Sequence, residues 1–419
     1  MSIATQKFNI VKIILNKSMF DENIINIILQ YYWNILDGKK KILLNWININ
    51  DLNWKVLSKN PNAIELLKER IEYENSLTNE ELDQLENQDK IDWRYLSANP
   101  NAIHLLREKI EYEKSLTNQK YKKLKNKIVW KWLSENPNGI DLLRERIQYE
   151  HFLTKAQYNR LKISHKINWG NLSFNPNAID LLKANPDKIN YYYLSFNKNA
   201  IELLRYRIDY EKLLRERIKY ERSLPFDDKA YWDDTGYWSE EFDELHYEDN
   251  KINWEYLSHN PNAIDLLKEN QDKIDWYYLS FNPNAIELLK ENQDKINWAN
   301  LFGNPNAIDL LKENQHKINW IWLSRNPNAI DLFRERIEYE NSLTNEELYQ
   351  LYNRIDWEYL SFVPNAIELL KENQDKINWD NLSSNPNAID LLKENQAKIY
   401  WRSISSNPSI FEDEPMPTI

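Results

Sequence analysis

The chain alternates short apolar clusters with a polar joint that contains proline. In the stretch INWEYLSHNPNAIDLLKENQDK, residues 252–273, Trp254 and Leu257 lie three positions apart, and a second apolar group of the same spacing follows Pro261. Apolar residues at intervals of three and four indicate one face of a helix. The residue before the opening ring is Asn253, and asparagine favours the N-cap of a helix. The stretch therefore predicts a hairpin of two short helices joined at the proline.

This pattern recurs along most of the chain. Of the eleven intervals between the opening rings of successive units, six are 22 residues, four are 37–39 and one is 63. A fixed period of this kind indicates a solenoid, in which short helices are stable only because neighbouring units stack. We predict an all-α fold, an α-solenoid of about twelve helical-hairpin repeats. The opening residues of repeats 1 to 12 are Trp54, Trp93, Trp130, Trp169, Tyr191, Trp254, Trp276, Trp298, Trp320, Trp357, Trp379 and Trp401.

The long repeats carry an addition after the second helix. In RERIEYENSLTNEELYQL, residues 334–351, Thr344 is followed three positions later by Glu347, and Thr78 and Glu81 repeat this spacing. Thr and Glu at this spacing are typical of a capping box, which opens a helix. We expect a third short helix that acts as a spacer and changes local curvature; a dedicated binding site is the alternative.

The joint Asn-Pro-Asn allows two helix starts. The first Asn is replaced by Val363 in one repeat and the proline by Lys198 in another, whereas the second position is Asn everywhere except Ser409. An acidic residue follows three positions later in eleven repeats, which favours the second Asn as N-cap. The first Asn and the proline would then end the first helix. A ladder of amides displayed to a ligand is the alternative. The predicted caps include Asn62, Asn101, Asn177, Asn262, Asn284, Asn306, Asn328 and Asn387.

Composition narrows the class of protein. With 42% apolar and 13% aromatic residues among 419, and only 5 glycines, the chain can bury a core and favours helices. The absence of cysteine excludes disulfides and fits a reducing compartment. A net charge of −11 argues against binding of a nucleic-acid backbone. No apolar run approaches the roughly 20 residues that span a membrane.

The repeats suggest five segments. Residues 1–50 are expected to form an N-terminal helical cap, 51–224 repeats mostly of the long form, 225–250 an acidic aromatic insertion, 251–411 repeats mostly of the short form, and 412–419 a tail. Within the cap, the stretch FDENIINIILQYYWNIL faintly resembles an F-box-like helix, which would imply a ubiquitin-ligase adaptor.

Positions that vary between repeats are the candidates for partner binding, because stacking fixes the others. Two positions on the first helix, two and five residues after the opening ring, are often aromatic and share one helix face. They would form an exposed stripe for a partner protein, or else fill the space between repeats. The residues are Tyr95, Trp132, Tyr193, Tyr256, Tyr278, Trp322 and Tyr359, with Phe174, Phe196 and Phe281.

The insertion offers a second candidate. Residues 227–250 hold ten acids and one lysine, with Tyr231, Trp232, Tyr237 and Trp238 among them. Such a segment could dock on a basic surface, with rings as anchors, or remain a solvated loop. Its carboxylates lack the spacing of an EF-hand, so no metal site is predicted.

Catalytic patterns are missing from the sequence. The six histidines include no His-Glu-x-x-His pair, five glycines leave no phosphate loop, and the serines of Leu-Ser-x-Asn-Pro recur in most repeats, which indicates a helix-end role. We expect no enzyme and no cofactor.

The phrase W-x-x-L-S-x-N-P-N-A-I-x-L-L, present at residues 54–67 and 254–267, resembles a repeat of multigene families in giant DNA viruses, mimivirus-like ones in particular. The resemblance covers roughly residues 51–411. It implies a viral protein of the host cytoplasm or the virion that is not secreted. The leading hypothesis is a scaffold that binds a partner protein; a structural component of the virion is the alternative.

Overall fold

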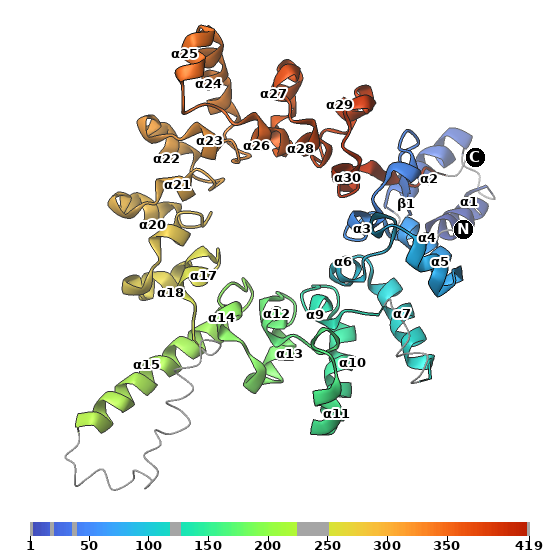
Figure 1. The fold of residues 1–419 in the computed structure, drawn as a ribbon, viewed down its shortest axis with the longest axis horizontal. Helices are drawn as coiled ribbons and strands as arrows, with labels where there is room; N and C mark the ends of the chain where they lie inside the picture. Colours follow the sequence, from blue (N-terminus) through green and yellow to red (C-terminus); the bar gives the residue numbers. More distant parts are fainter. Residues whose placement is uncertain (1–2, 17–20, 36–39, 118–126, 224–250, 417–419) are drawn as a thin grey trace. The chain divides into compact units, whose positions relative to one another are not determined.

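The computed structural model describes residues 3–16, 21–35, 40–117, 127–223 and 251–416. Over these residues the chain is mostly helical, and hairpins of short helices recur in a regular pattern, which confirms the predicted all-α solenoid (Figure 1). The chain divides into two compact units. Unit 1 combines Met1–Glu108 with Trp379–Ile419, and unit 2 is Lys109–Asn378.

The first helix of each repeat is four to six residues long. It begins after a capping side chain, as predicted: Asn253 Oδ1 accepts a hydrogen bond from Tyr256 N at 2.7 Å. The side chains of Val129 and Tyr400 do not cap their helices. The first helices are α3 (Trp54–Leu57), α6 (Trp93–Ala98), α9 (Trp130–Leu133), α12 (Trp169–Phe174), α14 (Tyr191–Leu194), α17 (Trp254–His259), α19 (Trp276–Leu279), α21 (Trp298–Leu301), α23 (Trp320–Leu323), α26 (Trp357–Phe362), α28 (Trp379–Ser383) and α30 (Trp401–Ile404).

The second helices vary in length, from five residues to the 23 of the longest. In unit 2, Figure 1 shows the first helices along the inner edge of the curve and the second helices pointing outward. The second helices are α4 (Ile64–Ser76), α7 (Ile103–Ser115), α10 (Ile140–His151), α13 (Ile179–Lys183), α15 (Ile201–Ser223), α18 (Ile264–Glu269), α20 (Ile286–Glu291), α22 (Ile308–Glu313), α24 (Ile330–Ser342), α27 (Ile367–Glu372) and α29 (Ile389–Glu394).

Three of the four long repeats contain the expected third helix within the described residues; in repeat 2 the corresponding stretch, 118–126, lies outside them. It forms α5 (Asn79–Gln84), α11 (Lys155–Arg160) and α25 (Asn345–Gln350). Thr78 and Glu81 make both bonds of the predicted capping box, as do Thr344 and Glu347. Glu340, near the end of α24, accepts a hydrogen bond from Ile355 N of the next repeat at 3.1 Å. This hydrogen bond therefore ties the second helix of a long repeat to the start of the repeat that follows it.

The predicted caps of the second helix are wrong. Each second helix begins one residue later than expected: α18 starts at Ile264, its N-cap is Ala263, and no side chain caps it. The same start, with alanine before isoleucine, recurs at α4, α13, α20, α22, α24 and α29, and α7 begins at Ile103, two residues after Asn101. The eight asparagines assigned as caps are Asn62, Asn101, Asn177, Asn262, Asn284, Asn306, Asn328 and Asn387.

The two asparagines of the joint instead bind the preceding repeat. Asn282 is fully buried, and its Nδ2 donates to the carbonyl oxygens of Ser258 and Asn260, both at 2.9 Å. Its Oδ1 accepts from Asn284 N at 3.0 Å, and Asn284 Nδ2 donates to the carbonyl of Pro261 at 2.9 Å. All donors of a buried amide are thus used, which is how a buried polar side chain becomes favourable. Equivalent bonds join other repeats, so we call this arrangement the asparagine ladder.

Eleven of the twelve joints contain a serine, and it binds the following repeat; repeat 8 has Phe302 at this position. Ser280 Oγ donates to the carbonyl of Trp276 at 2.7 Å and accepts from Asn297 N of the next repeat at 3.0 Å. The serine therefore ends the first helix, as predicted, and also fixes the start of the next repeat. The hydrophobic core is formed by apolar residues of both helices of the repeat, and Leu279, Ala285 and Leu289 have no exposed surface.

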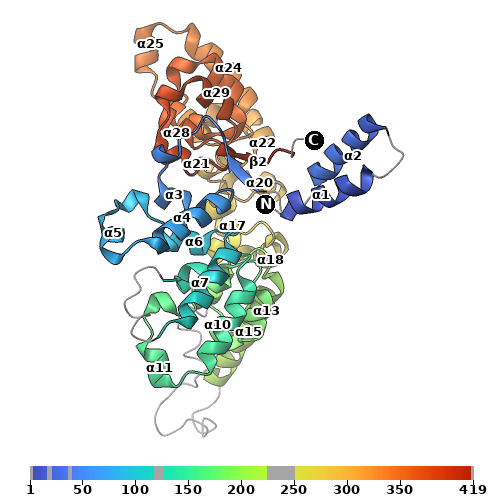
Figure 2. The same cartoon turned by 90° about the vertical axis from the view of Figure 1, so that its right-hand side faces the viewer.

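Unit 1 joins the end of the chain to its beginning. Strand β1 (Lys41–Leu43) pairs antiparallel with β2 (Phe411–Asp413), so Leu43 lies opposite Phe411. Asn60 Nδ2 donates to the carbonyls of Ser405 and Asn407 at 3.2 and 3.0 Å, the bonds of the asparagine ladder. Repeat 1 thus stacks on repeat 12, and we call this contact the seam (Figure 2). The sequence did not predict the two short strands.

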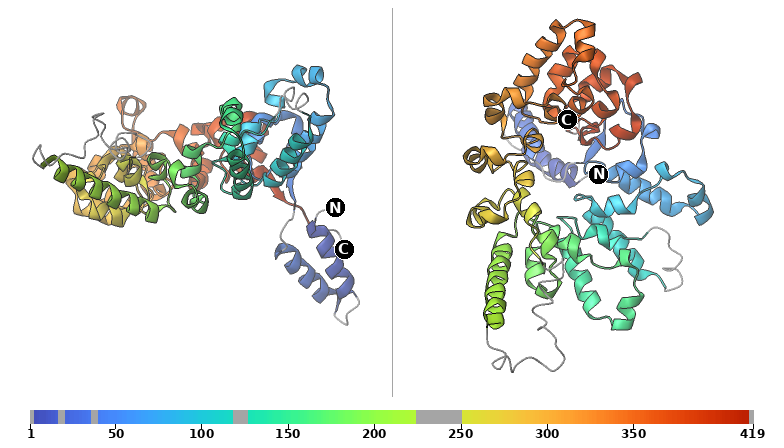
Figure 3. Two further views of the ribbon diagram at one scale, coloured as in Figure 1. Left: turned by 90° about the horizontal axis from the view of Figure 1, so that it is seen from below. Right: turned by 60° about the vertical axis from the view of Figure 1, so that its left-hand side comes forward.

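The N-terminal segment forms a pair of helices, α1 (Ile3–Leu15) and α2 (Glu22–Ile35), which lie side by side in Figure 3. Phe8, Ile25 and Leu29 are buried between them, with Met416 packed against this cluster. The opposite faces leave isoleucines exposed, among them Ile27 at 69%. None of the described helices combines the length and apolar character that a membrane span requires.

Candidate functional site

In unit 2, aromatic side chains from four successive repeats stack along the first helices. Phe174 and Phe196 have ring centroids 5.2 Å apart and nearly parallel planes, and Phe196 and His259 are 5.3 Å apart. The edge of Phe281 meets His259 at 6.0 Å. We call these four side chains the ring row. Each is the fifth residue after the opening ring of its repeat, so stacking of the repeats brings these positions together.

Two glycines make room for rings of a neighbouring repeat, Phe281 at the end of the ring row and Tyr193. A Cβ at Gly303, the equivalent position of the next repeat, would lie 2.8 Å from Phe281 Cε1. A Cβ at Gly170 would lie 3.0 Å from the ring of Tyr193. Both distances are below ordinary carbon contacts, so glycine lets a ring of the neighbouring repeat lie flat against the backbone. Two of only five glycines in the chain serve this packing.

The ring row borders an apolar groove of about 420 Å³. Phe174, Phe196 and His259 line it together with prolines of three joints, Pro176, Pro261 and Pro283. Lys198, which stands where the other joints have proline, is the one cation of this lining. The groove therefore presents flat carbon surfaces with a single charge at its edge.

Tyr192, Tyr193 and Tyr256 form a second cluster beside the ring row, which we call the tyrosine patch. Tyr277 and Tyr278 of the next repeat contact each other, with ring centroids 5.2 Å apart. Tyr192 meets Tyr256 edge to face at 5.1 Å, and Phe196 meets Tyr256 at 5.7 Å, so the patch and the ring row are continuous. The hydrogen bond between Tyr192 and Tyr256 raises the pKa of the Tyr192 hydroxyl. Rings that bury one side and expose a polar end are typical of binding surfaces.

The structure gathers only part of the predicted stripe. Phe174, Phe196, Phe281, Tyr193 and Tyr256 belong to the ring row or the tyrosine patch and keep exposed surface, with Tyr193 42% exposed. Phe174, Phe196, Phe281 and Tyr256 contact rings of neighbouring repeats, whereas Tyr193 and Tyr278 contact tyrosines of their own repeats. These rings therefore fill part of the space between repeats and keep exposed surface, and their binding of a partner protein stays a prediction.

The other predicted rings lie elsewhere. Tyr95 is on α6 in unit 1 and Trp132 is on α9. Trp322 and Tyr359 hold the guanidinium of Arg325 between them, 4.8 and 3.7 Å from the two ring centroids. In this part of the chain the space between rings is filled by a cation of the protein itself. Tyr231, Trp232, Tyr237 and Trp238 lie outside the described residues.

His259 is the member of the ring row that the sequence did not reveal as an aromatic position. Burial lowers the pKa of its imidazole, while a hydrogen bond to the backbone of Tyr278 acts in the opposite direction. Its Nδ1 is buried and has no hydrogen-bond partner among the described residues. The ring therefore stands in the row as a neutral aromatic surface at pH 7. Alignment on the repeat period, which places His259 level with three phenylalanines, is the signal that could have found it.

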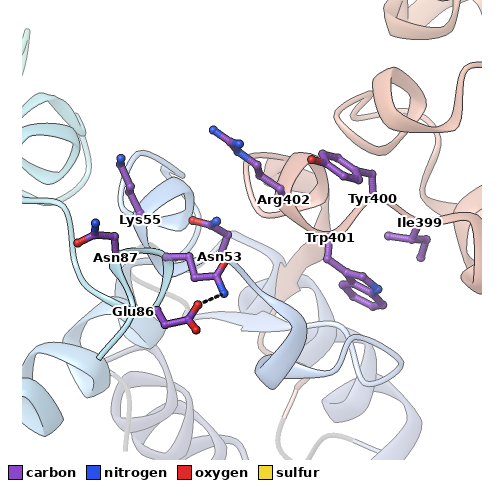
Figure 4. A pocket seen from close by; sticks show the side chains of 9 residues that line it. Asn53, Lys55, Glu86, Asn87, Ile399, Tyr400, Trp401 and Arg402 are labelled. Atoms are coloured by element: carbon purple, nitrogen blue, oxygen red, sulfur yellow. Dashed lines mark hydrogen bonds between the residues drawn. The ribbon is translucent and has the colours of Figure 1, made fainter. Parts of the chain in front are cut away.

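A second concave site lies at the seam, where a pocket of about 590 Å³ opens between α30 of repeat 12 and α3 of repeat 1 (Figure 4). Lys55 and Arg402 extend from opposite sides toward the open space, and Tyr400 and Trp401 form part of the wall. Glu86 also lines the pocket, but its carboxylate accepts a hydrogen bond from Gln88 Nε2 at 2.8 Å. We call this site the seam pocket.

Neither site carries a catalytic constellation. No group of three or more His, Asp or Glu side chains in the described parts of the chain is placed to hold a metal ion. The serines that recur in the joints are buried, and their hydroxyls bind backbone groups, as Ser58 Oγ does with the carbonyl of Trp54 at 2.9 Å. The fold and the sites together define an α-solenoid built on Asn-Pro-Asn joints with an exposed aromatic surface. Comparison with family models, curated proteins and solved structures finds no significant match.

Proposed function

We propose that this chain is a non-enzymatic scaffold that binds a partner protein through the ring row and the tyrosine patch. The observation that carries the proposal is the apolar groove, whose lining is made of rings and prolines. Grooves with aromatic walls bind extended, proline-rich segments, because such segments are stiff and present flat apolar faces. The partner segment that fits best is therefore extended, apolar and rich in proline. By the resemblance of its repeats, the chain would bind this partner protein while a giant DNA virus infects its host.

A peptide-display selection on the full chain tests this proposal. We expect proline-rich and aromatic peptides to be enriched, and the double variant Phe196→Ala/Phe281→Ala to weaken their binding by about tenfold or more, because buried aromatic anchors dominate interface energies. The matched control is Tyr349→Ala/Tyr352→Ala, which removes two rings that are 87% and 92% exposed. Affinity would be measured by fluorescence anisotropy.

A variant that lacks residues 227–250 distinguishes the two candidate binding sites, the ring row and the acidic insertion. If binding stays unchanged in this chain, the ring row is the binding surface. Loss of binding in this chain, with full binding in the Phe196→Ala/Phe281→Ala variant, would move the function to the insertion and contradict the proposal.

Acid is expected to weaken this site through His259. The pKa of His259 lies below its ordinary value of 6.5 in the folded chain because of burial, so below that pH the unfolded chain binds more protons than the folded one. The corresponding stability is complete above pH 6.5 and is lost as the pH falls through the folded pKa. His259→Phe should therefore show a smaller drop in melting temperature between pH 7.5 and pH 5 than the parent chain, and its peptide affinity should change less. Equal drops in both chains would refute this role.

The N-terminal helices favour a second candidate function. Ile10, Ile13 and Ile14 on α1 and Ile24 and Ile27 on α2 are 46–69% exposed, although all five are large apolar side chains. We infer that these helices dock on another protein, as an F-box-like adaptor would. Size-exclusion chromatography with a purified Skp1-like protein tests this: a complex that Ile27→Glu abolishes supports an adaptor, and no complex with the parent chain removes it.

A further inference from the structure

Two cations of the seam pocket have no carboxylate of their own to bind. Within the described residues neither Lys55 nor Arg402 takes part in an ion pair, and both side chains extend toward the open pocket (Figure 4). Both stand one residue after the opening ring of their repeats. Repeat 2 has Arg94 at this position, and its guanidinium lies 2.6 Å from the carboxylate of Asp92.

The reason for the difference is the residue at the N-cap. Repeat 2 begins with Asp92, which caps α6 and neutralises Arg94. Repeat 1 has the neutral Asn53 at this position and repeat 12 has Tyr400, which does not cap α30 at all. Glu86, the acid of the pocket lining, is hydrogen bonded to Gln88. The amide of Gln88 is neutral, so Glu86 keeps its negative charge, and the lining combines two cations, one carboxylate already bonded to Gln88, and aromatic walls.

We propose that the seam pocket binds an acidic segment of a partner protein, with a carboxylate between Lys55 and Arg402 and apolar atoms on Tyr400 and Trp401. A carboxylate is the natural counter-ion of an arginine and a lysine, and the rings supply contact area beside it. The residues of this site belong to unit 1 and those of the ring row to unit 2, so the proposal does not depend on the function proposed above.

Binding at this place has a consequence for the fold. Lys55 belongs to repeat 1 and Arg402 to repeat 12, so a carboxylate that contacts both links the two sides of the seam. Without an anion the two positive charges repel each other across the pocket. A ligand that binds only the closed seam raises the equilibrium constant for closing by the factor 1 + L/Kd, where L is the free ligand concentration. Occupancy of the pocket and closure of the seam are therefore coupled.

Fluorescence anisotropy with a short labelled peptide of repeated Glu-Glu-Tyr units tests the binding. We expect Lys55→Gln/Arg402→Gln to weaken binding by about tenfold or more, which corresponds to the loss of one strong charged contact. The control Lys312→Gln/Lys393→Gln removes the same charge from exposed positions on α22 and α29 and should bind as the parent chain does. The exchange Lys55→Arg/Arg402→Lys keeps both charges and should retain binding.

Hydrogen exchange of the full chain tests the coupling. At a peptide concentration about ten times Kd, amides that exchange only when the seam opens, such as Leu44 N on the carbonyl of Ile410, should exchange about tenfold more slowly. Equal loss of binding in both glutamine pairs would overturn the proposal, since net charge alone would explain it. Displacement of the peptide by inorganic phosphate at a similar concentration would also overturn it, because the site would then be one for free anions.

Discussion

Replacing Asn282 by valine is expected to lower the free energy of unfolding by about 4 kcal/mol. The substitution removes both Nδ2 donors, which leaves the carbonyl of Ser258 without its side-chain partner and that of Asn260 with Ala263 N alone, and it removes the acceptor of Asn284 N. Each unsatisfied buried group costs about 1–3 kcal/mol. Valine fits this position sterically, because Val363 occupies it in repeat 10 with 4% of its surface exposed. Urea unfolding followed by tryptophan fluorescence measures the change.

The same position offers a reverse test. Val363 provides no donor for the carbonyls of Ser324 and Asn326, so Val363→Asn should raise the free energy of unfolding by about 1 kcal/mol. Asn284→Ala is the control, since it removes only the bond from an exposed side chain to Pro261 and should cost about 1 kcal/mol. If Asn282→Val and Asn284→Ala have equal effects, the buried amide is not what joins the repeats.

Asn60→Val is expected to destabilise the protein as much as Asn282→Val, by about 4 kcal/mol. In a linear array the first repeat has no preceding neighbour, so the amide of its asparagine would bind water. Replacing that asparagine would then leave the free energy of unfolding unchanged. Here Asn60 binds the carbonyls of Ser405 and Asn407 and is 1% exposed. The substitution should therefore open the seam, although it lies at the start of the repeat array.

Hydrogen exchange localises this effect. Peptides that cover residues 41–57 and 401–413 should lose protection in Asn60→Val, whereas those of repeats 6 to 8 should not. Asn282→Val should give the opposite distribution. If residues 401–413 keep their protection in Asn60→Val, the last repeat does not depend on the first in solution.

The period of the sequence predicted the fold because each repeat contains the same spacing of apolar residues. Trp254 and Leu257, and Ile264 and Leu267, define two helix faces without any knowledge of distant contacts. Capping of the first helix and the capping boxes were predictable for the same reason: they join residues two or three positions apart.

The function of the joint could not be read in this way. Comparison of repeats favoured the second asparagine because the first is valine once, yet it is the first asparagine that is buried and bonded to two carbonyls 22 and 24 residues away. The mistake arose because both asparagines suit a helix start, and only stacking distinguishes them. The seam pocket was unpredictable for a similar reason, since Lys55 and Arg402 are 347 positions apart in a sequence of 419.

The ring row lies between these cases. Its positions were predicted as variable and aromatic, but which rings touch depends on the neighbours: Gly303 ends the row, and Arg325 fills the space farther along. The residue types found at these positions therefore predicted an aromatic surface, but only the structure shows how many repeats that surface covers.

Most repeats carry both halves of the joint, and this makes those repeats interchangeable; the exceptions are repeat 8, with Phe302 in place of the serine, and repeat 10, with Val363 in place of the first asparagine. The asparagines bind whatever repeat precedes, and the serine binds whatever follows, through backbone groups that every repeat possesses. Asn260 makes the ladder bond to Asn197 at 3.2 Å across 63 residues, and Asn282 makes the same bond to Asn260 across 22. Tandem duplication or loss of a 22-residue unit would therefore leave working joints on both sides. Recombination within such a gene can change the number of repeats and the surface of the encoded protein, while the contacts between repeats stay the same.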